Sequence, residues 1–164
     1  MNRTRILLPV LIVVGTLAIT ACNASLPQGT SGSIALLPFW DEEQGIKGVQ
    51  PLPDWTEEAQ LRQIAVPQSR GEVVELILPQ IGLSVLPEST GRYRGKGFTW
   101  DLYEFESHME DVPVDIVHFD LAIADSGSTT YIVGLLTLPD AYDASPALYD
   151  TVFTHVLYAL EPME

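Results

Sequence analysis

The sequence VDIVHFDLAIADSGSTTYIVGLLTL, residues 114–138, contains the pattern that decides the fold. From 114 to 124, apolar residues alternate with more polar ones, which is the period of a β-strand with one apolar face. Residues 125–128 read Asp-Ser-Gly-Ser and are typical of a turn, and residues 129–138 resemble a returning strand. Because consecutive strands joined by a short turn pair in opposite directions, the segment predicts an antiparallel meander.

Further strands are expected on the N-terminal side of this meander. Residues 98–105 are dense in aromatic and β-branched side chains and predict a strand. Residues 34–40 and 46–49 flank the turn-forming sequence Asp-Glu-Glu-Gln-Gly and predict a short hairpin. Residues 61–66 favour another strand, although a helical turn near Thr56 is an alternative.

The spacing of Ser69 and Glu72 is that of a capping box, which predicts the start of a helix. The helix should end near Pro79 and Gly82, because proline lacks a backbone donor and glycine tolerates a left-handed C-terminal stop. At 100° per residue, one apolar stripe of this helix consists of Val73, Val74, Ile77 and Ile81. Such a stripe is suited to packing on a sheet.

A second helix is predicted from Ser145-Pro146 to Leu160, with Ser145 as the N-cap, Pro146 at the first helical position and Pro162 as the stop. Its apolar face contains Tyr149, Val152, Phe153, Val156 and Leu160. Together these elements predict an α+β fold, an antiparallel β-sheet flanked by helices, in one domain spanning residues 34–164.

The composition is that of one acidic folded domain. The 164 residues are 46% hydrophobic and include 22 acidic and 8 basic side chains, a net charge of −14. This hydrophobic fraction is too high for a disordered acidic tail. The charge argues against nucleic acid as a partner, since phosphate binding requires clustered Lys and Arg. The single cysteine excludes an intrachain disulfide and a cysteine-based zinc site.

The N-terminus has the organisation of a targeting signal. Arg3 and Arg5 precede an apolar run over residues 6–19, and small residues follow. The run is shorter than the roughly 20 residues of a permanent membrane-spanning helix, so it predicts a cleaved signal peptide over residues 1–21.

Ile19-Thr20-Ala21-Cys22 resembles the bacterial lipobox, and an ordinary secretory signal is the alternative. The resemblance implies a mature chain that begins at Cys22, carries diacylglycerol and acyl lipid there, and is anchored outside the cytoplasm to the bacterial cell membrane. Such a chain retains 6 basic and 22 acidic residues, a charge of −16. Residues 22–33 are rich in serine, glycine and small polar residues and predict a flexible tether.

A further resemblance concerns the domain. In the N-terminal part it is carried by Phe-Trp-Asp-Glu at 39–42 and Gly-Ile-Lys-Gly-Val at 45–49, which is followed by a segment similar to Pro-x-x-Trp. Further along the chain it is carried by the strand containing Trp100, Tyr-Ile-Val at 131–133 and Ala-Leu-Glu-Pro at 159–162. In these features the chain resembles the PsbP-like lipoproteins, bacterial relatives of an extrinsic photosystem II subunit. The resemblance implies a PsbP-like α-β-α sandwich and a non-enzymatic accessory or assembly role, and similar modules accompany exported bacterial hydrolases.

No catalytic residues are predicted, and the chain is not expected to be an enzyme. Gly-x-Ser-x-Gly, P-loop and Gly-x-Gly-x-x-Gly sequences are absent. His118 and Asp120 lie two apart on a predicted strand, so they share a face and could reach one metal ion. Two ligands are too few for a site, and a half-exposed polar pair is the favoured interpretation. No cofactor is expected besides the lipid on Cys22.

Histidine and tryptophan side chains are further candidates for binding. His155 lies off the apolar stripe of the last helix and is expected to be exposed, and His108 lies in a charged, solvated loop. Tryptophans more often lie in a core than at a ligand surface, although Trp40 and Trp55 lie beside turns and could line a groove.

The basic residues are concentrated in one short segment. Arg92, Arg94 and Lys96 are half of the basic residues in the mature chain, and Tyr93 lies among them. In so acidic a protein this segment is the expected contact for an acidic partner, the alternative being a solvated loop. The leading hypothesis is a lipid-anchored extracytoplasmic accessory or binding module with an unknown protein partner. The alternatives are a small exported metal-binding protein, a hydrolase-associated domain, or a structural envelope protein.

Overall fold

The computed structural model describes residues 24–25, 35–51, 58–108 and 116–163. They form two antiparallel sheets, one with the order β1-β2-β3-β9 and one with the order β4-β8-β7-β6-β5. Within these residues, no helix is long and apolar enough to cross a membrane. The strands are β1 (Ala24–Ser25), β2 (Ala35–Asp41), β3 (Ile46–Pro51), β4 (Ala59–Val66), β5 (Gly91–Arg94), β6 (Thr99–Ser107), β7 (Val117–Ser126), β8 (Thr129–Thr137) and β9 (Glu161–Pro162).

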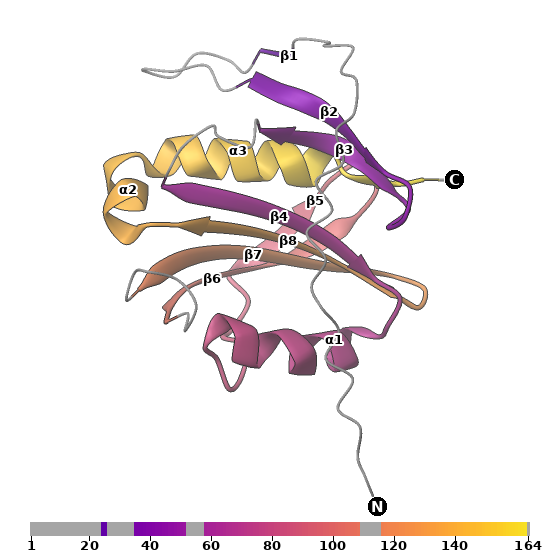
Figure 1. The fold of residues 1–164 in the computed structure, drawn as a ribbon, viewed down its shortest axis with the longest axis horizontal. Coiled ribbons are helices and arrows are strands. Elements are labelled where there is room, and N and C mark those ends of the chain that lie inside the picture. Colours follow the sequence, from indigo (N-terminus) through magenta and orange to yellow (C-terminus); the bar gives the residue numbers. More distant parts are fainter. Residues whose placement is uncertain (1–23, 26–34, 52–57, 109–115, 164) are drawn as a thin grey trace, which may run out of the picture.

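The larger sheet lies between helices. Helix α1 (Arg70–Ile77) covers one face, and α2 (Pro139–Ala144) and α3 (Pro146–Ala159) cover the other, with the smaller sheet on the far side of α3 (Figure 1). Strands β6, β7 and β8 are adjacent and antiparallel, as the meander pattern predicts. The predicted α+β class is therefore confirmed, and the smaller sheet extends the sandwich that the sequence suggests.

The hairpin and the fourth strand form close to their predicted positions. Strands β2 and β3 pair around a turn in which Gly45 has a φ of 64°, a left-handed conformation that glycine adopts without a steric penalty. Strand β1 lies within the predicted tether and pairs with β2, whereas Cys22 and the rest of residues 22–33 lie outside the described residues. The predicted tether thus contributes two residues to the smaller sheet.

Helix α1 begins at the predicted capping box. The carboxylate of Glu72 accepts hydrogen bonds from the Ser69 backbone N–H at 3.1 Å and from the Ser69 hydroxyl at 2.6 Å. After Ile77 the chain tightens into a 3₁₀ turn, η1 (Leu78–Ile81), which Gly82 ends in the left-handed conformation. From the predicted stripe, Val73 is buried and packs with side chains of β6, β7 and β8.

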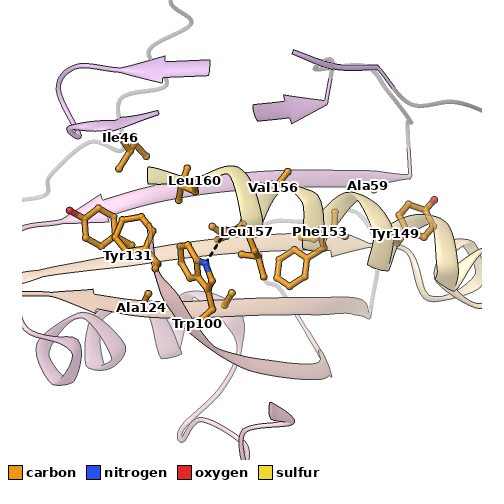
Figure 2. Packing of buried hydrophobic residues seen from close by; sticks show 14 residues of the cluster. Ile46, Ala59, Trp100, Ala124, Tyr131, Tyr149, Phe153, Val156, Leu157 and Leu160 are labelled. Atoms are coloured by element: carbon orange, nitrogen blue, oxygen red, sulfur yellow. Dashed lines mark hydrogen bonds between the residues drawn. The ribbon is translucent and has the colours of Figure 1, made fainter. Parts of the chain in front are cut away.

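Helix α3 carries the main core. All five residues of the predicted apolar face are buried, and Leu157 is buried with them. Figure 2 shows this helix lying over the sheet, with its apolar side chains directed at Trp100, Tyr131 and Ala124. Ser145 lies at the N-cap, but its side chain makes no capping hydrogen bond. Helix α2 was not predicted; it is only six residues long, too short for a clear helical period.

The C-terminal end of α3 is capped by the hairpin of β5 and β6. The last carbonyls of a helix have no partner inside the helix. The indole Nε1 of Trp100 donates to the Leu157 carbonyl at 3.0 Å (Figure 2), and the Lys96 backbone N–H donates to the Tyr158 carbonyl at 2.9 Å. A side chain at Gly95 would place its Cβ 2.4 Å from the Leu157 carbonyl oxygen, so this approach requires glycine.

Replacing Trp100 by Phe should therefore destabilise the domain strongly. The side chain is 0% exposed, and the substitution removes a buried hydrogen bond as well as packing volume. We expect a loss of about 2–4 kcal/mol in the free energy of unfolding, measured by urea denaturation. The matched control is Trp40→Phe: contrary to the expectation that tryptophans lie in the core, Trp40 is 54% exposed, and its replacement should change stability by less than about 0.5 kcal/mol. Equal losses in the two variants would contradict the capping role of Trp100.

Candidate functional site: the basic edge of the larger sheet

The basic segment predicted to contact a partner is a strand, not a loop. Strand β5 is the last strand of the larger sheet and pairs with β6 alone among the described residues. The alternation of Arg92, Tyr93 and Arg94 is a period of two, and this is the signal from which the strand could have been recognised. It was missed because the strand spans only four residues and begins with a glycine.

The strand separates its side chains onto two faces. Tyr93 lies opposite Trp100 and packs against the main core, whereas Arg92 and Arg94 project from the other face and are exposed. The Arg92 side chain is 77% exposed and its Nε donates to Asp101 Oδ1 at 2.8 Å. Among the described residues, the guanidinium of Arg94 has no hydrogen-bond or ion-pair partner. Two cationic side chains thus lie next to each other along one edge.

Asp101 holds Arg92 in this position. Its other carboxylate oxygen accepts a hydrogen bond from Arg70 Nη1 at 2.6 Å, and Arg70 also donates to the Tyr103 hydroxyl. Burial raises the pKa of Asp101, but the hydrogen bonds from Arg70 and Arg92 outweigh burial and hold that pKa below its usual value. The carboxylate therefore remains ionised at neutral pH and links α1 to the edge of the sheet.

Lys96 lies beyond the strand and faces a different surface. Its Nζ is 3.9 Å from Glu161 Oε1 and 5.5 Å from the centre of the Tyr158 ring at the end of α3. Lys47 Nζ is 3.7 Å from the other oxygen of the same carboxylate. The structure therefore brings Arg92 and Arg94 together and places Tyr93 and Lys96 elsewhere. We call the strand β5 with these two arginines the basic edge.

The predicted pair of His118 and Asp120 does share a face, with 3.6 Å between Nε2 and Oδ2. The prediction that this face is half-exposed is wrong: the two residues are 5% and 8% exposed. The reason is the unpredicted helix α2, whose Tyr142 ring stacks on the His118 ring at a centroid distance of 3.6 Å. A strand pattern that shows polar residues on one face does not reveal that a helix will cover them.

This buried cluster contains polar atoms that have no hydrogen-bond partner. Neither His118 Nε2, Asp120 Oδ2 nor Thr137 Oγ1 has a hydrogen-bond partner. Burial lowers the pKa of His118, but the carboxylates of Asp120, Glu104 and Glu106 raise it more, so that the net change is upward. Burial, together with the charges of Asp120, Asp150 and Glu104, raises the pKa of Tyr142 above its usual value.

The described residues place no third metal ligand beside His118 and Asp120. In the part of the chain that the structure describes, there is no group of three or more His, Cys, Asp or Glu side chains placed to hold a metal ion. His108 is exposed, as expected. His155 is half-buried rather than exposed, and its Nδ1 lies 2.8 Å from the Thr151 carbonyl oxygen one turn earlier in α3. Trp55 and most of the acidic residues near His108 lie outside the described residues.

Comparison with known proteins shows which known fold the chain resembles. No family model and no curated protein matches the sequence. Among solved structures, the chain is similar to the solution structure of cyanobacterial PsbP (CyanoP) from Synechocystis sp. PCC 6803, with a TM-score of 0.51. The fold is PsbP-like. The similarity covers 83% of this chain and 97% of that chain at 13% sequence identity, so it concerns the arrangement of the elements and not their surface chemistry.

The buried histidine should make stability depend on pH in a defined direction. Because the pKa of His118 is raised in the folded protein, protonated His118 stabilises the fold. This contribution is complete below about pH 6.5, the usual pKa of an unfolded histidine, and is lost as the pH rises through the folded-state value. Urea denaturation across this range should show that the stability advantage of the wild type over His118→Gln falls with increasing pH.

The matched control for this prediction is the same comparison in an Asp120→Asn background. Removing the nearest carboxylate should reduce the pH dependence, because Asp120 has the largest of the effects that raise the pKa of His118. An advantage that is independent of pH, or that grows as the pH rises, would contradict the assignment.

Proposed function

We propose that the protein is a non-catalytic accessory module, held outside the cytoplasm by lipid on Cys22, that binds an acidic protein partner through its basic edge. The observation that supports this most directly is the position of Arg92 and Arg94, exposed next to each other on a strand at the end of the sheet. Arginine is enriched at protein interfaces relative to the rest of the protein surface.

The charge of the remaining surface supports the same proposal. The mature chain would carry a charge of −16, so most of its surface should repel an acidic partner. The other four basic side chains have partners of their own: Arg70 contacts Asp101, Lys47 and Lys96 contact Glu161, and Arg62 contacts Gln60. The basic edge is therefore the place where an acidic surface could approach with favourable electrostatics.

The anchor rests on the sequence at the N-terminus. Cys22 is the only cysteine, and it occupies the position that the lipobox requires. Two acyl chains would hold the protein at the membrane, because each buried methylene contributes about 0.8 kcal/mol. A hydrolase-associated domain is compatible with this proposal, since it would also be a binding module. The metal-binding alternative gains no support from the described residues, which supply only His118 and Asp120.

Reversing the charge of Arg94 should slow association with the partner. Rim charges act mainly on the rate of encounter, so Arg94→Glu should lower the association rate about tenfold at low salt and reduce its salt dependence. The partner is first captured from the native membrane with a photo-crosslinking residue at position 94, and the same residue at exposed Glu75 on α1 is the control. Association is then measured at low and high salt.

The control variant for the rate is Arg62→Glu, which makes the same charge change on β4 at the opposite side of the sheet. It should leave the association rate close to that of the wild type. Identical rates and salt slopes for Arg94→Glu and the wild type would remove the basic edge from the proposal.

Removing the thiol of Cys22 should abolish lipid attachment. In the bacterial host, Cys22→Ser should remain an uncleaved precursor that incorporates no radioactive palmitate. The control is Ser25→Ala, which leaves the cysteine in place and should be labelled as strongly as the wild type. Palmitate labelling of the Cys22→Ser variant at the level of the wild type would refute the anchor.

A further inference from the structure

The backbone of β5 leaves hydrogen-bonding groups facing away from the sheet. The Gly95 backbone N–H donates to the Phe98 carbonyl at 2.9 Å, in line with the register that pairs Arg94 with Thr99. In an antiparallel pair, hydrogen-bonded and non-hydrogen-bonded positions alternate along the strand. Tyr93 therefore bonds to β6, whereas the N–H and C=O groups of Arg92 and Arg94 point outward. Among the described residues, no group bonds to these outward N–H and C=O groups.

The opposite edge of the same sheet, strand β4, forms hydrogen bonds with the hairpin of β2 and β3. The Ala65 backbone N–H of β4 donates to the side-chain oxygen of Gln44 at 2.7 Å. The Gln63 side chain, also on β4, donates to the Val49 carbonyl of β3 at 3.4 Å. The hairpin of β2 and β3 thus satisfies one backbone N–H of the β4 edge and contacts this edge through a second side chain. Among the described residues, the larger sheet thus has one edge, β4, that is bonded to the hairpin of β2 and β3 and one edge, β5, whose outward backbone groups have no partner.

The open edge is also held in place before any partner arrives. The residues that follow β5 are fixed to the end of α3 by the Lys96 N–H bond to Tyr158 and by the close approach of Gly95 to Leu157. On the other side, Asp101 holds the Arg92 side chain. A strand that is already ordered loses little conformational entropy when another strand pairs with it.

The side chains of this edge select the kind of strand that can be added. Arg92 and Arg94 lie two residues apart on one face, with Tyr93 on the other, so a matching strand needs carboxylates at alternate positions and an apolar residue between them. A second copy of β5 would place arginines opposite arginines, which is destabilising. The four residues of β5 correspond to about 13 Å of extended chain.

We propose that the partner contributes an extended acidic segment that pairs with β5 as a sixth strand of the larger sheet. Main-chain hydrogen bonds to Arg92 and Arg94 would supply affinity, and alternate aspartate or glutamate side chains would supply specificity through the two guanidinium groups. This inference rests on the proposed function and specifies the structure of the partner at the same surface. Charged residues on edge strands also serve to prevent pairing between sheets, and the experiment separates that role from strand addition.

The test uses the detergent-solubilised full chain and a short capped peptide in which aspartate alternates with valine. Two further peptides carry N-methyl groups, one on the aspartate amides and one on the valine amides. Strand addition requires that one of the methylated peptides binds at least about tenfold more weakly than the other, because it lacks the amides that bond to β5. If methylating the aspartate amides lowers the affinity, the pairing is antiparallel, because residues directly opposite each other then exchange hydrogen bonds. If methylating the valine amides lowers the affinity, the pairing is parallel.

Two variants test the protein side of the contact. Arg94→Gln removes the charge, and Arg94→Pro removes the charge and the outward N–H; proline is tolerated at an edge position whose N–H faces solvent. The proline variant should bind the unmethylated peptide about tenfold more weakly than the glutamine variant. Arg62→Gln on β4 is the matched control and should bind like the wild type, because it removes the same charge at the edge of the sheet opposite to β5.

Amide hydrogen exchange, measured by NMR on the wild type, gives a direct readout. Saturating peptide should slow exchange at the Arg92 and Arg94 amides at least about tenfold and leave the Tyr93 amide, which already bonds to β6, unchanged. Equal affinities of the two methylated peptides, unchanged exchange at Arg92 and Arg94, or no binding of the unmethylated peptide would each overturn strand addition. Crosslinking of a partner at position 94 in spite of such a result would leave the proposed function standing, whereas an absence of crosslinking would remove both.

Discussion

The packing of the β5–β6 hairpin against the last turn of α3 is the contact on which the other features of the domain depend. Trp100 lies in the centre of the main core and donates its indole hydrogen to the Leu157 carbonyl, and Lys96 caps the next carbonyl with its backbone N–H. These two bonds satisfy groups that a helix leaves unpaired at its end. They also fix where the chain leaves β5 and returns in β6, so the same contact that closes the core helps to position the exposed edge.

The basic edge acquires its character from this arrangement. Tyr93 lies opposite Trp100 and packs against the core. Because side chains alternate along a strand, Arg92 and Arg94 then project from the other face. Asp101 and Arg70 form the support beneath them and connect the edge to α1. In a protein with a charge of −14, two adjacent exposed arginines on this strand are a local concentration of positive charge. In the proposed function, this edge of the PsbP-like sandwich is the binding surface.

The buried pair of His118 and Asp120 shows a different consequence of packing. A histidine next to a carboxylate on a strand has the pattern of a solvated polar face, but Tyr142 of α2 covers it and removes water from both side chains. Three polar atoms are left without hydrogen-bond partners there, each of which costs stability. Burial lowers the pKa of His118, but the charges of Asp120 and of Glu104 and Glu106 on the neighbouring strand raise it more and favour the protonated histidine. This cluster therefore affects the stability of the domain and makes that stability depend on pH.

The sequence by itself determined the elements whose signals are local. The meander of β6 to β8, the capping box of α1 and the apolar face of α3 were predicted because alternation, capping residues and helical periodicity act over a few residues. The resemblance to PsbP-like proteins was carried by short motifs such as Phe-Trp-Asp-Glu at 39–42 and Ala-Leu-Glu-Pro at 159–162, and the similarity to a solved structure confirms it for the fold. Only the tertiary structure decided that residues 91–94 are an edge strand, that α2 covers His118, and that Trp40 is exposed while Trp100 is buried. These outcomes depend on which surfaces meet after the chain has folded, and pairings between residues such as Trp100 and Leu157, 57 positions apart, leave no local pattern in the sequence.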